Sequence, residues 1–433
     1  MRTRQPIVRA IVAGVLAAPA STACGPADGD GLAGGETATV ETASGAVAAL
    51  AAEAGSTPAP ASHLFVWAAD GDAADTDFLA VIGADPGSPD YGRVVATAPV
   101  GLTGMAHHTE HAMPEGDLLF ANAFRAGASF VFDLSDPENP TVGSTFTNAG
   151  PYTFPHSFER LPNGGVLATF QTQAEGNLEA GGLVELDSLG RYVRGSDAAN
   201  DVQPTVRPYS LAILPDRDRV VTTTTDMRSE VPVATSVQIW RLADLALLHT
   251  IPLPESPAGA HWLPAEPRVL PDGTVIVTTF ACGMFLLEGV ETDAPRARLV
   301  ASFPWENPRE CALPVIRGRY WVQTNATTHS LVSLDMSDPA EPEIVDELVL
   351  DADAEPHWIS IEPGGDRIVL TGPGSLRGRV LLVRLDPENG ALGLIEDFRD
   401  PGSDGPGVSF GRTEWPHGAT GAAVPHGAVF SRR

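Results

Sequence analysis

The hydrophobic pattern of the chain consists of short β-type runs from Leu64 onward. These runs are rich in Val, Ile, Phe and Thr, and turn sequences such as LPNGG, LPDRD, LPDGT and EPGGD separate them. No amphipathic helical pattern of normal length interrupts them. Because β-branched and aromatic residues between Gly- and Pro-containing turns favour strands, the pattern predicts an all-β fold.

The runs form a repeat of about fifty residues when they are aligned on the turns. PHSFERLPNGGVLATF, PYSLAILPDRDRVVTTT and PHWISIEPGGDRIVLTG each contain a strand, a turn and a second strand. SFVFDLSDPENPTVGSTF and LVSLDMSDPAEPEIVDEL each add a third and a fourth strand around an acidic Pro turn. Four strands in a repeat of this length are typical of a β-propeller blade.

Seven units can be counted from residues that mark the first strand of each unit. The markers are His108, His156, Ser210, His261, Cys311, His357 and His426. The last unit supplies one strand, and three further strands are available in HLFVWAAD, DFLAVIGAD and GRVVATAP near the start of the repeat region. Since pairing of the two ends leaves no open edge, the sequence predicts a seven-bladed β-propeller closed by its N- and C-terminal strands.

The amino-terminal segment has the pattern of an export signal. Three arginines precede an apolar run, and small residues come directly before Cys24. This pattern predicts a lipoprotein-type signal peptide over residues 1–23 with Cys24 as the candidate lipidation site, and ordinary cleavage nearby is the alternative. The composition predicts a disordered Ala/Gly/Pro-rich linker over 24–62 and the propeller over 63–433. We therefore expect an exported protein, periplasmic or held at the cell envelope.

Charge and the choice of basic residue narrow the range of functions. The chain has 27 basic and 55 acidic residues, a formal net charge of −28. Such an excess of negative charge disfavours nucleic acid and anionic membrane surfaces as partners, so membrane contact is expected only through the possible lipid anchor. All the basic residues are Arg, which excludes Schiff-base lysines and phosphate-loop lysines.

Two cysteines lie within the predicted propeller, Cys282 and Cys311. An oxidising compartment permits a disulfide between them. Two free buried thiols fit the sequence as well, so both states stay open at this point.

Histidine gathers at the starts of first strands, which line the channel of a propeller. Of the 11 histidines, seven lie at such positions, among them His107, His108, His156 and His426. Because strands within a blade alternate in direction, His329, between a second and a third strand, is expected at the same face. Several imidazoles around a channel suit copper, zinc or iron, and carboxylate-poor surroundings disfavour calcium or magnesium. For any single histidine the alternative is a hydrogen bond to a neighbouring blade.

Several motifs follow one another in order over most of residues 105–433. They are the His107–His108 pair, PHSFERLPNGGVLATF, EGNLEAGGLVELD, SVQIWRLADLALLHTIPL, TTFACGMF, HSLVSLDMSDPAEP and PHGAVF. Together they resemble the selenium-binding protein and methanethiol oxidase family of seven-bladed propellers. The family's usual Cys-x-x-Cys after the His-His pair is absent from HHTEHAMPEGD, which argues against a thiol-based selenium or redox role.

The resemblance implies an activity and a set of site residues. The family's oxidases are copper-dependent and convert a small thiol such as methanethiol, with oxygen and water, into an aldehyde, hydrogen sulfide and peroxide. The positions that match the family's conserved histidines are His107 or His108, His156, His329 and His426. Glu110 and Glu159 are the candidates for a base that takes the thiol proton.

A different class of function also fits the sequence. A non-catalytic propeller on the cell envelope, which binds a protein or polymer partner, would have the same acidic surface and tether. Lactone hydrolysis around a central calcium would need Glu, Asn and Asp at the channel, where histidine is enriched instead. Metal content is the observation that separates the oxidase from the binding propeller.

Overall fold

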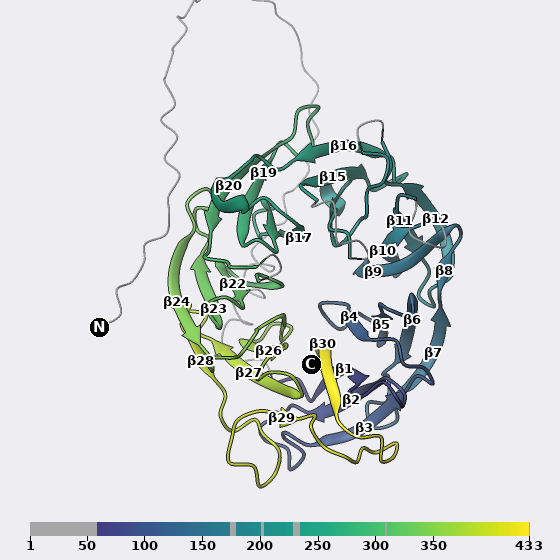
Figure 1. Cartoon of the computed structure of the whole chain (residues 1–433), viewed down its shortest axis with the longest axis vertical. Coiled ribbons are helices and arrows are strands. Elements are labelled where there is room, and N and C mark those ends of the chain that lie inside the picture. Colours follow the sequence, from purple (N-terminus) through teal and green to yellow (C-terminus); the bar gives the residue numbers. More distant parts are fainter. Residues whose placement is uncertain (1–58, 174–178, 201–202, 228–233, 308–309, 433) are drawn as a thin grey trace, which may run out of the picture. The chain divides into compact units, whose positions relative to one another are not determined.

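The described part of the chain is a ring of antiparallel sheets (Figure 1). The computed structural model describes residues 59–432 except 174–178, 201–202, 228–233 and 308–309. The predicted signal peptide and almost all of the predicted linker therefore lie outside the described residues. Among the described residues, the helical segments are two 3-10 turns, η2 (Pro215–Arg217) and η3 (Pro257–Gly259), and no helix there is long and apolar enough to cross a bilayer.

Seven sheets make up the ring, and we number them as blades 1–7, as the repeat predicts. In each, the first strand named here lies nearest the channel (Figure 1). Blade 1 contains β30 (Ala423–Phe430), β1 (His63–Asp70), β2 (Phe78–Gly83) and β3 (Val94–Pro99). Blade 2 contains β4 (Ala106–Thr109), β5 (Leu118–Ala123), β6 (Ala128–Asp133) and β7 (Thr141–Phe146). Blade 3 contains β9 (Tyr152–Arg160), β10 (Val166–Thr172), β11 (Gly182–Leu186) and β12 (Tyr192–Asp197), with β8 (Asn148–Ala149) paired to β9.

The remaining blades repeat the same order. Blade 4 contains β13 (Leu211–Leu214), β14 (Arg219–Thr223), β15 (Ser236–Arg241) and β16 (Leu247–Pro252). Blade 5 contains β17 (Pro264–Val269), β18 (Val275–Thr279), β19 (Gly283–Glu288) and β20 (Arg296–Ser302). Blade 6 contains β21 (Pro314–Arg317), β22 (Tyr320–Asn325), β23 (Ser330–Asp335) and β24 (Glu343–Val349). Blade 7 contains β25 (Trp358–Ile361), β26 (Arg367–Thr371), β27 (Arg379–Leu385) and β28 (Leu392–Leu394), with β29 (Val408–Ser409) paired to β27.

Blade 1 closes the ring by joining distant parts of the chain. Its inner strand β30 pairs antiparallel with β1, in a register that places Leu64 opposite Phe430 and Val66 opposite Ala428. The predicted closure is confirmed. Because β30 supplies the inner strand of the sheet that β1, β2 and β3 begin, this blade has its four strands and the ring is closed between its first and last blades.

The hydrophobic core lies between neighbouring blades. In β5, Leu119 belongs to a cluster shared with blade 1, whereas its sequence neighbour Phe120 belongs to a cluster shared with blade 3. Successive side chains of a strand point to opposite faces, and both faces of a blade are covered. This double burial explains the nearly continuous apolar middle strands, such as FLAVIG in β2, where all six residues are buried.

A disulfide joins blade 5 to the start of blade 6. Cys282 lies in the turn between β18 and β19, and Cys311 precedes β21. Their Cα atoms are 5.0 Å apart and 29 positions separate them in sequence. Of the two states that the sequence allowed, the structure has the bonded one.

Candidate metal centre

An irregularity in the inner strand of blade 2 turns two histidines toward the channel. Ala106 pairs with Ala123 and Thr109 pairs with Ala121, so His107 and His108 together face Asn122 alone. Two residues opposite one define a β-bulge, which bends the strand and re-aims its side chains. The adjacent pair His107–His108 therefore occupies the bulge itself, and the two rings lie stacked with centroids 4.1 Å apart.

The same device recurs in three other inner strands. In β9 the bulge contains His156 and Ser157, opposite Thr169. In β30 it contains His426 and Gly427, opposite Trp67. In β17 it contains Ala265 and Glu266, opposite Thr278. Bulges are common beside active sites, and here four of them contain four histidines and one glutamate.

The bulges of blades 1, 2 and 3 bring four imidazoles together. One ligand atom each of His107, His108 and His156 lies within 4.8 Å of the others. The ring of His426 is 4.6 Å from that of His107 and 5.7 Å from that of His108, between centroids. His108 and His156 are fully buried. A metal ion bound at about 2.1 Å from each nitrogen needs nitrogens no more than about 4 Å apart, so for His107, His108 and His156 a contraction of less than about 1 Å would suffice.

Nitrogen atoms without hydrogen-bond partners point to a missing ligand. The Nδ1 of His156 lies 2.9 Å from the carbonyl oxygen of Tyr209, which can only accept, so Nδ1 carries the proton and Nε2 carries the lone pair. That Nε2 has no partner, and neither do both ring nitrogens of His108 and the Nδ1 of His426. Buried polar atoms are ordinarily paired, so this donor set fits a transition metal that imidazole binds well.

Burial keeps these imidazoles neutral. It lowers the pKa of His156 to about 3, with its bond to Tyr209 opposing the shift. Burial also places the pKa values of His108 and His426 well below the usual range, and the neighbouring histidines lower them further. Metal ligation requires the neutral form, so these rings can bind a metal without first losing a proton.

Not every predicted ligand joins this group. The Nδ1 of His329 lies 2.7 Å from the carbonyl oxygen of Ala354, which holds that ring against the backbone that leads into blade 7. The structure thus brings together His107, His108, His156 and His426, and it gives His329 a different contact. His357, one of the seven markers of first strands, has its ring 5.0 Å from that of His426.

The two candidate bases occupy different surroundings. Glu110 is buried, accepts two bonds from Arg160 at 2.7 and 2.9 Å, and accepts another from the Phe120 amide at 2.8 Å. These bonds occupy both carboxylate oxygens and tie blade 2 to β9 of blade 3. Glu159 is half-buried, and among the described residues its carboxylate takes part in no hydrogen bond or ion pair.

The electrostatic surroundings of Glu159 favour proton exchange near neutrality. Burial raises its pKa to about 7, Arg268 lowers it, and the carboxylates of Glu110 and Glu266 raise it further. A group with such a pKa can both accept and release a proton at neutral pH.

Glu266 is a channel residue that the sequence did not indicate. It is 1% exposed, and its Oε2 accepts from Ser210 Oγ and Arg268 Nη1, each at 2.7 Å. Its Oε1 has no hydrogen-bond partner, and His111 Nε2 lies 3.8 Å from its Oε2. The repeat could have indicated this residue. The alignment took His261 as the start of the inner strand, whereas the strand begins at Pro264.

Aromatic side chains surround the histidines. Ring centroids lie 4.0 Å apart for Tyr209 and His156, 5.0 Å for Trp358 and His108, and 5.5 Å for Phe124 and His107. These aromatic rings would make favourable van der Waals contacts with a small apolar group beside the histidines.

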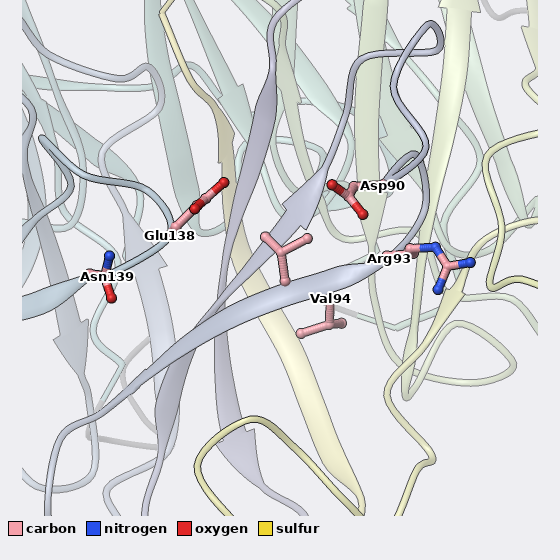
Figure 2. A pocket seen from close by; sticks show the side chains of 6 residues that line it. Asp90, Arg93, Val94, Glu138 and Asn139 are labelled. Carbon is pink, nitrogen blue, oxygen red and sulfur yellow. The ribbon is translucent and has the colours of Figure 1, made fainter.

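A hollow on the outer surface lies elsewhere. It lies at strand β3, the outer strand of blade 1 (Figure 2). Its volume is about 520 Å³. Its lining residues are Asp90, Arg93, Val94, Val95, Glu138 and Asn139. None of the predicted site residues contributes to it, so the candidate centre is the histidine group at the inner strands.

Comparison with known proteins finds similarities in sequence and in fold. A scan against models of protein families finds no match. A methanethiol oxidase from a Hyphomicrobium species is 36% identical over 103 residues, and one from Ruegeria pomeroyi is 28% identical over 152 residues. A protein of Sulfolobus tokodaii described as a hypothetical selenium-binding protein has a similar structure, with a TM-score of 0.69, 15% identity and coverage of 86% of this chain and 94% of that one. The predicted family resemblance is confirmed.

The segments matched to the two methanethiol oxidases cover about a third or less of each protein. The aligned segments span 23% of this chain and 23% of the Hyphomicrobium protein, and 33% of this chain and 34% of the Ruegeria protein. A periplasmic gluconolactonase of Pseudomonas aeruginosa also shares the fold, with a TM-score of 0.56, 15% identity and coverage of 77% of this chain and 95% of that one. Propeller architecture is thus common to proteins of different activity, and function has to be argued from the site.

Proposed function

We propose that this chain is a metal-dependent oxidase of small thiols, with copper in the site formed by His107, His108, His156 and His426. The observation that carries the proposal is the cluster of buried imidazoles from adjoining blades, in which both ring nitrogens of His108, the Nε2 of His156 and the Nδ1 of His426 have no hydrogen-bond partner. The likeness to methanethiol oxidases supports the thiol as substrate. Zinc and iron are the other metals that imidazole ligands suit.

The overall conversion requires proton transfer as well as electron transfer. Methanethiol, dioxygen and water would give formaldehyde, hydrogen sulfide and hydrogen peroxide, a balanced reaction in which the thiol carbon is oxidised and dioxygen is reduced. A bound copper ion would supply the redox chemistry and favour the thiolate form of the substrate.

The chain's own residues would hold the substrate and take its proton. The aromatic walls of Phe124, Tyr209 and Trp358 would hold the alkyl group away from water. Glu159, with a pKa of about 7, would accept the thiol proton and release it to solvent. Glu110 was the other candidate, and its oxygens are already engaged by Arg160 and the Phe120 amide.

We also propose that the protein is exported, as a periplasmic or cell-envelope lipoprotein anchored through Cys24. The supporting observations are the signal pattern of residues 1–23 and the disulfide between Cys282 and Cys311. Disulfides of this kind persist in oxidising compartments.

Elemental analysis of the purified protein tests the proposed function. We expect one transition-metal ion per chain in the wild type, and its loss in His156→Ala and His426→Ala. His249→Ala is the matched control, because His249 lies on the outer strand β16, and it should keep the metal. A metal-free wild type that also fails to bind added Cu(II) would overturn the proposal and favour the binding propeller.

A thiol assay tests the reaction once metal is present. Peroxide and sulfide should appear together from methanethiol in the wild type. The rate should rise as the pH passes about 7 and Glu159 loses its proton, and Glu159→Gln should remove that rise while keeping the metal. Metal-loaded protein that releases neither product would contradict the oxidase assignment.

A further inference from the structure

In blades 3 and 4 a threonine hydroxyl on the second strand accepts a hydrogen bond from a backbone N–H of the residues that lead into or form the inner strand. In blade 3, Thr169 Oγ1 accepts from the Ser157 amide at 3.1 Å and donates to the carbonyl of Tyr209 in the next blade at 2.6 Å. Thr223 repeats this in blade 4, toward Ser210 at 3.1 Å and Ala265 at 2.6 Å. One threonine hydroxyl thus joins its own inner strand to the inner strand of the following blade.

Blade 2 has an asparagine at this position. The Oδ1 of Asn122 accepts from the His108 amide at 2.7 Å. Its Nδ2 donates to the carbonyls of Pro155 at 2.9 Å and His156 at 3.1 Å. The carbonyls of Pro155 and His156 can only accept, and the backbone N–H of His108 can only donate. These partners therefore determine which end of the Asn122 side-chain amide carries the oxygen and which the nitrogen.

Asn122 is also held from the other side. The indole of Trp67 in blade 1 donates to the backbone carbonyl of Asn122 at 2.8 Å, and Trp67 lies opposite the bulge that contains His426. The side chain of Asn122 is completely buried. A single residue therefore contacts the three blades whose inner strands carry the four clustered histidines.

We propose that Asn122 is a positioning residue of the metal centre, which sets the spacing between the strands of His108 and His156. This inference rests on the proposed metal site. Metal–nitrogen distances tolerate deviations of only about 0.2 Å, and the two rings stand on different blades that are joined here by the Asn122 amide. Threonine has one donor and would bind only one of the two carbonyls, so asparagine gives the strand of His156 a second fixed point.

The opposite side of His156 is fixed as well. Its ring Nδ1 meets the Tyr209 carbonyl, and Thr169 donates to that same carbonyl. Asn122 therefore holds the His156 backbone, and Tyr209 holds its ring. Together these contacts fix the direction in which the Nε2 of His156 points. Partners of this kind orient ligands and commonly affect metal affinity by 10- to 100-fold, an order-of-magnitude range.

The test compares three variants of the full chain with Cu(II) as the probe. Asn122→Ala removes the bonds to both blades, Asn122→Thr places at this site the residue that blades 3 and 4 use, and Thr223→Ala removes a matching link between blades 4 and 5. Equilibrium dialysis measures Cu(II) affinity, electron paramagnetic resonance reports the ligand geometry, and thermal unfolding measures stability.

We expect Asn122→Ala to weaken Cu(II) binding by roughly 10- to 100-fold and to change the resonance spectrum. Thr223→Ala should lower the melting temperature and leave affinity and spectrum as in the wild type. Asn122→Thr should fold, recover part of the affinity and keep an altered spectrum, because one bond to the strand of His156 is still missing.

Three outcomes would overturn the inference. Wild-type affinity and spectrum in Asn122→Thr and in any folded Asn122→Ala would show that the amide does not position the ligands. An equal loss of affinity in Thr223→Ala would assign the effect to general destabilisation. A wild type that binds no Cu(II) would instead remove the metal site itself, and so would overturn the proposed function together with this inference.

Discussion

The bulged and the regular inner strands of the propeller differ in what they present to the channel. The strands β4, β9, β17 and β30 each contain a bulge, and their bulge residues include His107, His108, His156, Glu266 and His426. The strands β13, β21 and β25 pair without a shift in register. One repeat can therefore supply both scaffold and site, because a single extra residue in an inner strand changes the direction of its side chains and leaves the other strands of the blade in place.

The two sides of the ring are also joined differently. Blades 1, 2 and 3 are linked by buried hydrogen bonds around Asn122 and by the ion pair of Glu110 with Arg160. Blades 5 and 6 are linked by the disulfide of Cys282 and Cys311. Loss of a link on the histidine side should therefore affect metal binding, whereas loss of the disulfide should affect stability alone.

Among the substitutions compared at neutral pH, removal of the disulfide should have the largest effect on stability. The double variant Cys282→Ala/Cys311→Ala frees a loop with a sequence separation of 29, which in the chain-entropy account corresponds to about 3.5 kcal/mol of unfolding free energy. Denaturant unfolding measures this change, and equilibrium dialysis should show unchanged Cu(II) affinity. A fall in affinity matching that of His156→Ala would remove the distinction between the two sides.

Loss of the buried ion pair should cost slightly less stability. Glu110→Ala leaves Arg160 without its carboxylate between blades 2 and 3, and we expect a loss of about 3 kcal/mol because an uncompensated charge remains partly buried. The control Glu288→Ala breaks a surface pair with Arg296, which should change the unfolding free energy by less than about 1 kcal/mol. Equal changes in the two variants, measured by denaturant unfolding, would contradict the structural role given to Glu110.

A methyl group in the bulge of β30 should disturb both stability and metal binding. A Cβ on Gly427 would lie 2.6 Å from the Thr109 amide nitrogen and 2.9 Å from the His107 carbonyl oxygen. Both are backbone atoms, so we expect Gly427→Ala to cost about 2 kcal/mol and to weaken Cu(II) binding. Gly393→Ala, with nothing within 4 Å of its Cβ, is the control for calorimetry and dialysis and should match the wild type in both.

Acid should destabilise the metal-free histidine side gradually. The pKa of His156 falls from 6.5 in the unfolded chain to about 3 in the fold, so the unfolded state binds more protons between these values. Its stabilising contribution is complete above pH 6.5 and is lost as the pH falls toward 3, by up to about 1.4 kcal/mol per pH unit. His156→Gln should have a shallower dependence of unfolding free energy on pH over that window. Identical slopes in variant and wild type would show that the buried ring does not titrate as described.

The sequence predicted the architecture well because its signals are local. Turn sequences and β-branched runs specify strands within each repeat, and the count of seven units and the pairing of the chain's two ends are confirmed. The bulges were not predictable in the same way, because a bulge is a mismatch between two strands and depends on the register of both. Glu266 was missed because the alignment took His261 as the start of this inner strand, whereas the strand begins at Pro264.

The chain's pattern of residues specifies an all-β ring of seven blades and places histidines on its inner strands, because strand preference, turn chemistry and repeat length act over short distances. Contacts between blades specify the rest. They bring the rings of His107, His108, His156 and His426 together, give His329 another partner, pair Glu110 with Arg160 and join Cys282 to Cys311. These contacts depend on how sheets far apart in sequence pack around the channel, and that packing follows from burial of the whole core.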